Sequence, residues 1–136
     1  SSVMKRNRIC FLLGLLIFAV TSVNGQILKD LEQYQYTYTQ TDQLDQAIKE
    51  AIINSISLIG SEKYIHDITS IEVATCTKKK NLKDFIKKAR NIIKKEKISQ
   101  LQSTIKDDMT VEIYAKDGEI IILSIIDDFA TITVMK

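Results

Sequence analysis

Two side chains in the middle of the sequence could act as a nucleophile and its general base. They are Cys76 and His66, the only histidine of the chain. A catalytic Cys–His pair needs the base within about 3 Å of the sulfur, and a third group must orient the imidazole. The residues between them are typical of a loop and then a strand, and extended chain would hold the two side chains far apart. We therefore predict a buried structural thiol at Cys76, with an intermolecular disulfide as the alternative, and no catalytic dyad.

Two pairs of adjacent aspartates, Asp107-Asp108 and Asp127-Asp128, are the second candidate for chemistry. Two carboxylates could flank a scissile bond in a hydrolase or bind a hard cation such as Ca²⁺. Both pairs, however, stand between apolar segments where turns are expected, and Asp favours turns by hydrogen bonding to nearby backbone groups. The sequence lacks calcium-loop spacing and His/Glu metal motifs. We therefore interpret both pairs as turn residues and predict no catalytic and no metal-binding residue.

The glycines and tyrosines also lack the spacing of a ligand-binding motif. After residue 25 the only glycines are Gly60 and Gly118, and neither lies in a phosphate-binding sequence. Tyr34, Tyr36 and Tyr38 alternate with Gln and Thr, and such a stripe could stack on sugars or bases. The same alternation is typical of one face of an edge strand, which we favour. The sequence therefore predicts no cofactor-binding residue and no cofactor.

The segment with the strongest charge is KKKNLKDFIKKARNIIKKEK, residues 78–97, which holds ten Lys or Arg and two acids. Its apolar residues recur at helical spacing and predict an amphipathic helix. The basic residues assigned to its outer face are Lys83, Lys87, Lys88, Arg90, Lys94 and Lys95. This face is either simply solvated or contacts an acidic partner or anionic lipid headgroups. Nucleic acid is not an expected partner, because the segment has no interleaved aromatic residues for stacking on bases.

The N-terminal residues predict an export signal. Basic residues precede an apolar run of twelve, Ile9–Val20, and the remnant Ser1–Val3 reads as upstream of the natural start. A membrane-spanning helix needs about 20 apolar residues, so this run fits a signal peptide better than an anchor. The small residues before the boundary place the cut between Gly25 and Gln26. We therefore expect residues 1–25 to be a cleaved signal peptide, with an uncleaved N-terminal anchor as the alternative.

The expected mature chain, residues 26–136, has the length of one small domain and no further membrane segment. It holds sixteen Lys or Arg against seventeen Asp or Glu, which gives a net charge of −1. Residues 78–97 carry +8 of this charge and the remainder −9, so the two signs are separated along the chain. Only Cys76 remains after cleavage, which excludes an intramolecular disulfide. The sequence stops in an apparent strand, which leaves truncation at Lys136 as an alternative to a complete domain.

The hydrophobic pattern predicts two helices and a sheet. Asp117-Gly118 is a strong hairpin signal, because a type I′ turn needs positive φ at both central residues. The strand at 120–126 is apolar on both faces, so it is either central and covered on both sides or meets a partner with one face. The expected helices lie at 42–59 and within 78–97, and the expected strands at 34–40, 68–75, 109–116, 119–126 and 129–135. This predicts an α+β fold: a mostly antiparallel four- to five-stranded sheet with two helices packed on one face.

Three stretches together resemble one family of small exported proteins. They are the strand ITSIEVATC, the helix FIKKARNIIKKE and the hairpin array VEIYAKDGEIIILSIIDDFATITVM. The chain is similar over Asp30 to Met135 to the Bacteroidota family named domain of unknown function forty-two fifty-two. The resemblance implies an exported protein of the periplasm or cell envelope and brings no active site. Members of that family continue past the last strand with a glycine and a short tail, whereas this sequence stops at Lys136.

These observations predict an exported, non-catalytic binding module of the cell envelope. Its contact surface would be either the second apolar face of the strand at 120–126 or the basic helix. The partner would be a second copy, another envelope protein or an anionic headgroup. The alternatives are a small hydrolase-type enzyme whose residues match no known motif, and a structural or regulatory envelope component. An enzyme would show a pocket where titratable groups converge, and a binding module an exposed charged or apolar patch.

Overall fold

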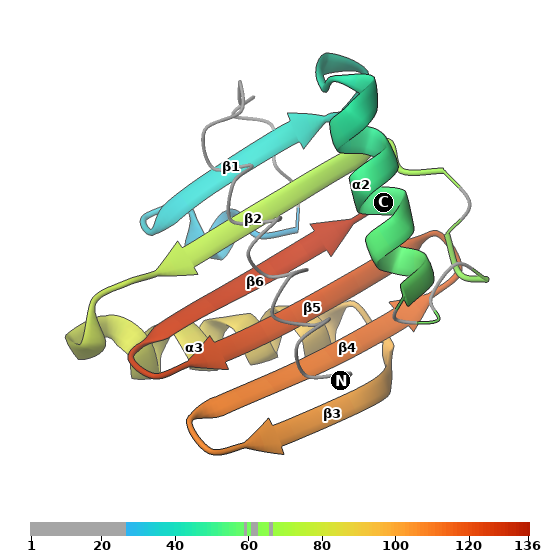
Figure 1. Cartoon of the computed structure of the whole chain (residues 1–136). Helices are drawn as coiled ribbons and strands as arrows, with labels where there is room; N and C mark the ends of the chain where they lie inside the picture. The colour runs from blue at the N-terminus through green and yellow to red at the C-terminus, as the bar shows by residue number, and fades with distance from the viewer. Residues whose placement is uncertain (1–26, 59, 61–62, 66) are drawn as a thin grey trace.

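The computed structural model describes residues 27–58, 60, 63–65 and 67–136. The described chain forms one sheet, two α-helices and two short 3-10 turns (Figure 1). The strands are β1 (Gln35–Gln40), β2 (Ser70–Cys76), β3 (Ser99–Lys106), β4 (Met109–Lys116), β5 (Glu119–Ile126) and β6 (Phe129–Met135). The helices are α2 (Gln46–Leu58) and α3 (Lys79–Lys95), and the 3-10 turns are η2 (Lys29–Leu31) and η3 (Thr41–Gln43). The predicted signal peptide and His66 lie outside the described residues.

The strand order in the sheet is β1-β2-β6-β5-β4-β3, and every neighbouring pair is antiparallel. The α+β class and the antiparallel sheet are therefore confirmed, but the sheet has six strands and not four to five. The strand missed was β3, whose sequence SQLQSTIK is mostly exposed on both faces. It has no alternation of apolar and polar residues, because it lies at the edge of the sheet and pairs only with β4.

The turns of the meander follow the sequence signals. The Asp117-Gly118 turn joins β4 to β5 in register, and Gly118 has a φ of 78°, but Asp117 does not have a positive φ, so the turn is not the predicted type I′. Asp107 and Asp127 occupy the corresponding turns on either side, with φ values of 52° and 53°. Asp is one of the few residues with a side chain that visits this left-handed region at modest cost. Both aspartate pairs are turn residues, as predicted.

The two helices lie on opposite faces of the sheet, which corrects the prediction that they pack on one face (Figure 1). Ile52 and Ile56 of α2 pack with the sheet residues that include Ile122. Phe85 and other apolar residues of α3 pack with those that include Ile121. Neighbouring residues of a strand point to opposite faces, so a strand that is apolar at every position needs cover on both sides. The sheet therefore has two cores, one under each helix.

Strand β5 is central and covered on both faces, which is one of the two alternatives predicted for it. Ile120, Ile121, Ile122 and Leu123 are all buried, between β4 and β6 in the sheet. No face of this stretch is left to form an interface. The apolar strand is therefore not the contact surface that the sequence allowed, and the basic helix is the remaining candidate.

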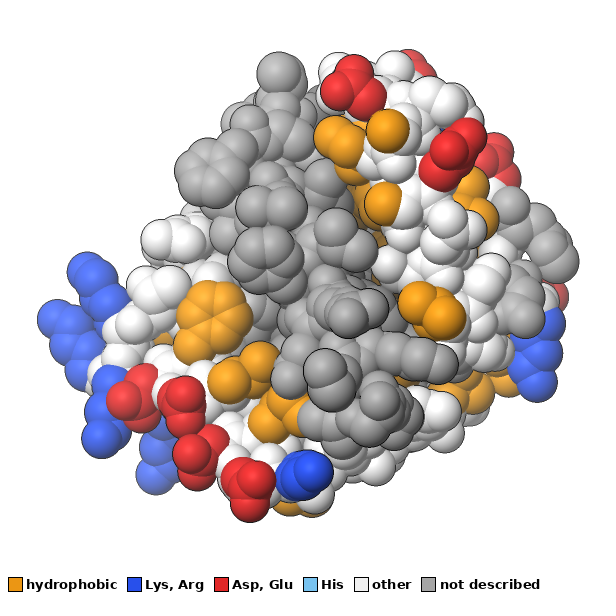
Figure 2. All heavy atoms as spheres, viewed as in Figure 1, with side chains coloured by type: hydrophobic (Ala, Val, Ile, Leu, Met, Phe, Trp, Pro, Cys, Tyr) orange, Lys and Arg blue, Asp and Glu red, His pale blue; other side chains and the backbone are white. Residues whose placement is uncertain are grey.

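Helix α2 is shorter and less buried than its sequence pattern predicts. It begins at Gln46, because residues 41–43 form the turn η3, and Ile59 lies outside the described residues. It buries Ile52, Ser55 and Ile56, whereas Leu58 is 56% exposed. Hydrophobic side chains accordingly show on the outer side of α2 (Figure 2). Among the described residues no helix combines the length and apolar character needed to cross a membrane.

Candidate anion-binding surface on helix α3

Helix α3 is seated on the sheet by a continuous apolar face. Its buried residues are Phe85, Ala89, Ile92 and Ile93. The ring of Tyr34 meets the ring of Phe85 edge to face, with 5.0 Å between centroids and 88° between planes. Edge-to-face pairs of this kind are favourable because the positive ring edge meets the negative ring face. The apolar face fixes the rotation of α3 about its axis and turns the opposite, basic face to solvent.

The six basic residues predicted on the outer face divide into two groups. Lys83, Lys87, Lys94 and Lys95 are exposed, and none of them forms an ion pair within the described part of the chain. Lys88 pairs with Asp84 one turn earlier at 3.2 Å, and Arg90 pairs with Glu112 of β4 at 2.7 Å. Two of the six predicted residues therefore serve contacts within the protein.

Four exposed lysines form a straight line along α3, which we name the basic ridge: Lys80, Lys83, Lys87 and Lys94. At 100° and 1.5 Å per residue, they lie within about 60° around the helix axis and extend over about 21 Å. Neighbours three and four residues apart on a helix repel when they carry like charge, by about 0.2–0.5 kcal/mol per pair. The packing of the apolar face offsets this cost. Lys and Arg side chains cluster where α3 begins, at the left edge of Figure 2.

Arg90 is an anchor between α3 and the sheet. Its guanidinium donates to Glu112 Oε1 at 2.7 Å, and the hydroxyl of Tyr114 donates to the same oxygen at 2.7 Å. The hydrogen bond to Glu112 is the main cause that raises the pKa of Arg90. Burial, followed by the bond to Glu112, raises the pKa of Tyr114 to about 12. Sequence reasoning missed Glu112 and Tyr114, because they lie on a different element from Arg90.

The flank of α3 carries a second long-range contact. The hydroxyl of Tyr34 donates to Asp84 Oδ2 at 2.6 Å, and this bond is the main cause that lowers the pKa of Asp84. The same bond is the main cause that raises the pKa of Tyr34 to about 12. Asp84 thus stays ionised beside Lys88 and neutralises it. The predicted stripe of tyrosines lies at the edge of the sheet, and Tyr34 and Tyr36 pack against the core under α3.

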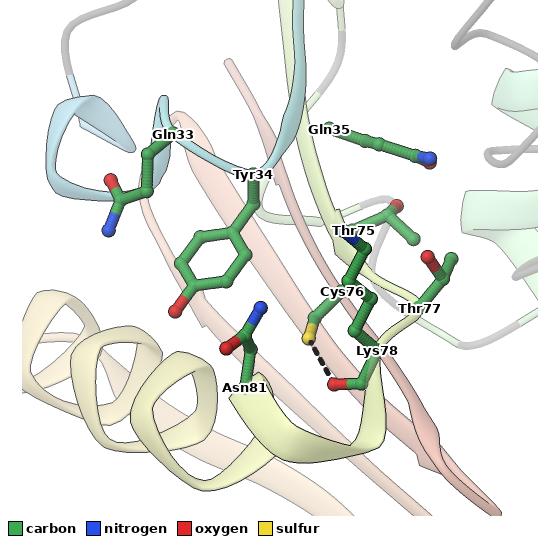
Figure 3. Close-up of a pocket in the computed structure, with 8 residues that line it drawn as sticks. All are labelled: Gln33, Tyr34, Gln35, Thr75, Cys76, Thr77, Lys78 and Asn81. Carbon is green, nitrogen blue, oxygen red and sulfur yellow. Dashed lines mark hydrogen bonds between the residues drawn. The ribbon is translucent and has the colours of Figure 1, made fainter.

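A cavity of about 320 Å³ opens between β1, β2 and the start of α3 (Figure 3). The described residues that line it are Gln33, Tyr34, Gln35, Thr75, Cys76, Thr77, Lys78 and Asn81. The thiol of Cys76 is buried and donates to the carbonyl oxygen of Lys78 at 3.4 Å, which confirms the predicted buried cysteine. None of these eight residues is a histidine or a carboxylate, so the lining supplies the thiol with no general base.

The two aspartate turns lie side by side, which the sequence did not reveal. The backbone N–H of Asp127 donates to the carbonyl of Asp108 at 3.0 Å. Acidic side chains accordingly gather at one end of the sheet, at the lower left of Figure 2. Across the described ranges, however, no group of three or more His, Cys, Asp or Glu side chains is arranged to hold a metal ion.

Lys116 links the C-terminal end of α3 to a buried carboxylate. The ammonium of Lys116 donates to the carbonyl of Glu96, the residue that ends the helix, at 2.6 Å. Lys116 and Lys136 lie 3.7 and 3.6 Å from the carboxylate of Glu119. Burial, and then repulsion from Glu96, raises the pKa of Glu119 above its ordinary value of 4.5. The folded state therefore binds a proton at Glu119 more tightly than the unfolded chain does.

This raised pKa predicts a loss of stability as pH increases. The contribution of Glu119 is fully present below about pH 4.5 and is lost as pH rises through the raised folded-state pKa. In Glu119→Gln this side chain cannot ionise. As pH increases over the same range, the free energy of unfolding of the variant should therefore increase relative to that of the natural protein. Urea unfolding at a series of pH values measures the difference, with Asp117→Asn in the neighbouring exposed turn as control. Parallel pH profiles for the natural protein and Glu119→Gln would contradict the prediction.

The chain was also compared with known proteins. No family model matched it, and neither did any curated protein or solved structure. The resemblance drawn from the three sequence stretches therefore stays a prediction.

Proposed function

We propose that this protein is an exported, non-catalytic binding module of the cell envelope that contacts anionic lipid headgroups through the basic ridge. The observation that supports this most is the ridge itself. Lys80, Lys83, Lys87 and Lys94 are exposed, lie in one line on a firmly seated helix, and form no ion pair within the described residues. The predicted export signal and the family resemblance supply the location.

The chemistry around the ridge favours a lipid surface over a protein partner. Protein interfaces rely on buried aromatic or aliphatic anchors at their centre. The exposed large hydrophobic residues of the described chain are Ile48, Ile53, Leu58, Ile105 and Phe129, and none of them is on α3. Polybasic contact with headgroups needs only charge, at about 1 kcal/mol for each lysine near the surface. Four lysines therefore support weak, reversible and oriented binding that salt would screen.

The test is vesicle binding by the processed protein released from the full-length chain. A variant with Lys80, Lys83, Lys87 and Lys94 all changed to Gln is compared with the natural protein on phosphatidylglycerol-containing vesicles. We expect affinity to fall by about tenfold to a thousandfold, because four lost lysines remove up to about 4 kcal/mol and each 1.4 kcal/mol corresponds to about tenfold. Neutral phosphatidylcholine vesicles should bind neither protein, and high salt should release the natural protein.

The matched control removes the same charge elsewhere, at Lys29, Lys49, Lys63 and Lys106, each changed to Gln. If the ridge is the contact surface, this control keeps its affinity within about twofold of the natural protein. An equal loss in both variants would show that only total charge matters. Failure of the natural protein to bind anionic vesicles at low salt would reject the lipid function and turn attention to an acidic protein partner.

A further inference from the structure

The segment that follows the predicted cut is built into the fold through a buried carboxylate. Glu72, in the middle of β2, is only 2% exposed. Its Oε2 accepts the backbone N–H of Ile27 at 3.3 Å, and its Oε1 accepts that of Leu28 at 3.1 Å. The hydroxyl of Tyr36 donates to Oε1 at 3.0 Å. Two consecutive backbone N–H groups therefore point at one carboxylate.

The charge of this carboxylate has no cationic partner in the described part of the chain. None of the ion pairs found there includes Glu72. Its three hydrogen bonds come from neutral donors. A buried carboxylate is costly unless its charge is both hydrogen-bonded and paired. Within the described residues, the charge of Glu72 is therefore stabilised by hydrogen bonds from neutral donors alone.

The same segment also seals the core under α3. Leu28 and Leu31 are fully buried there, with Phe85 and Ile121 in the same cluster. The described chain thus begins with the hydrogen bond from Ile27, and the residues that follow it pack directly into this hydrophobic core. Ile27 is the second residue after the predicted cleavage site, which brings the expected new N-terminus close to Glu72.

We propose that Glu72 is the receptor for the α-ammonium group that cleavage between Gly25 and Gln26 creates. Hydrolysis adds water across that amide: Gly25 receives the hydroxyl and becomes a carboxylate, and the nitrogen of Gln26 becomes an amine, which is protonated at neutral pH. The nitrogen of Gln26 is at most about 3.6 Å along the chain from that of Ile27. Cleavage would thus give residue 26 a positive charge one residue before the N–H group of Ile27 that Glu72 accepts, where the uncut chain has a neutral amide.

Cleavage between Gly25 and Gln26 therefore adds a stabilising ion pair to the folded state as well as releasing the chain. The new ion pair forms between the end of the chain and the second strand of the sheet, on the α3 side of the fold. This inference rests on the predicted cleavage and is independent of lipid binding, which the ridge alone carries. The two proposals fail in different experiments.

The test moves the new N-terminus away from Glu72. The full-length chain is secreted with and without a Gly-Ser insertion between Gly25 and Gln26, each in a Glu72 and a Glu72→Gln background. All four chains carry Gln26→Ser, because an N-terminal glutamine can cyclise to a neutral lactam. We expect the insertion to lower the Tm by about 4–8 °C when Glu72 is present and by less than about 1 °C in Glu72→Gln.

N-terminal sequencing of the secreted chains comes first, and a cut at any other bond would overturn the proposal. An insertion effect of the same size in both backgrounds, or none in the Glu72 background, would also overturn it. Should Glu72→Gln fail to fold, the pKa of the α-amine decides between the outcomes. In the chain without the insertion, the pKa of the α-amine should lie at least about one unit above its ordinary range of 7.7–8.0. In the chain with the insertion, this pKa should lie within that range. Equal pKa values would reject the ion pair.

Discussion

Replacing Phe85 with alanine should destabilise the protein by about 3–5 kcal/mol, which is the largest effect we expect from a single substitution. The ring is fully buried at the centre of the core under α3 and stacks edge to face with Tyr34. Alanine would leave a cavity that neighbours on a rigid sheet cannot fill. The free energy of unfolding in urea, followed by circular dichroism, measures the loss.

Two further substitutions serve as controls for this result. Phe85→Leu keeps most of the volume and should lose much less, because the cavity it leaves is smaller. Ile53→Ala, on the exposed side of α2, should change stability by no more than about 0.5 kcal/mol. A loss below about 1 kcal/mol for Phe85→Ala would mean that α3 is not firmly seated. The basic ridge would then lack the rigid support that the proposed function requires.

Arg90→Ala should destabilise the protein by about 2 kcal/mol, through the carboxylate that it leaves behind. Glu112 is nearly buried and would keep only the hydroxyl of Tyr114 as a partner among the contacts described. The Arg90 side chain is 46% exposed, so its own desolvation contributes little. Chemical denaturation of Arg90→Ala, Glu112→Gln and the double variant gives the coupling free energy directly.

The double variant distinguishes the two causes of destabilisation. Once Glu112 is neutral, removing Arg90 leaves no buried charge, so the double variant should be more stable than Arg90→Ala alone. The coupling free energy should reach about 1 kcal/mol or more. Strictly additive losses would show that Arg90 acts only by packing its aliphatic stem over the sheet. Lys95→Ala, also basic but unpaired in the described structure, serves as the control.

The parts of the fold that the sequence predicted are those determined by nearby residues. The Asp117-Gly118 turn needs only its own backbone conformation, and the apolar run from Ile120 marks a covered strand by itself. The orientation of α3 follows from the spacing of its apolar residues, which recur with the helical period. Each of these signals lies within about ten residues, so no distant contact had to be known.

The parts that were missed depend on partners far away in the sequence. Strand β3 has no apolar face of its own and exists because β4 pairs with it. The placement of β2 between β1 and β6, and of the helices on opposite faces, is a matter of which surfaces meet. The apolar pattern of β5 pointed to cover on both faces, but not to which helix supplies each side.

The same division applies to the candidate site. The ion pair of Lys88 with Asp84 is an i,i+4 contact that helical spacing alone could have supplied. The ion pair between Arg90 and Glu112 forms because α3 crosses β4. Helical periodicity therefore could not predict that Arg90 forms a contact within the protein. Lys80 was not among the predicted residues, yet the helix begins early enough to place it on the ridge. The buried role of Glu72 needed the fold as a whole.

The position of β6 in the interior of the sheet has a consequence for how the chain folds in time. Strand β2 pairs with β6 in a register that joins Ile71 to Met135 across the length of the domain. Until β6 is available, β1 and β2 form only a two-stranded ribbon, which is marginally stable alone. Pairings between such distant segments also form slowly. A newly made chain therefore cannot complete this sheet until its last described strand has been synthesised, and β1 and β2 lack their neighbour in the sheet until then.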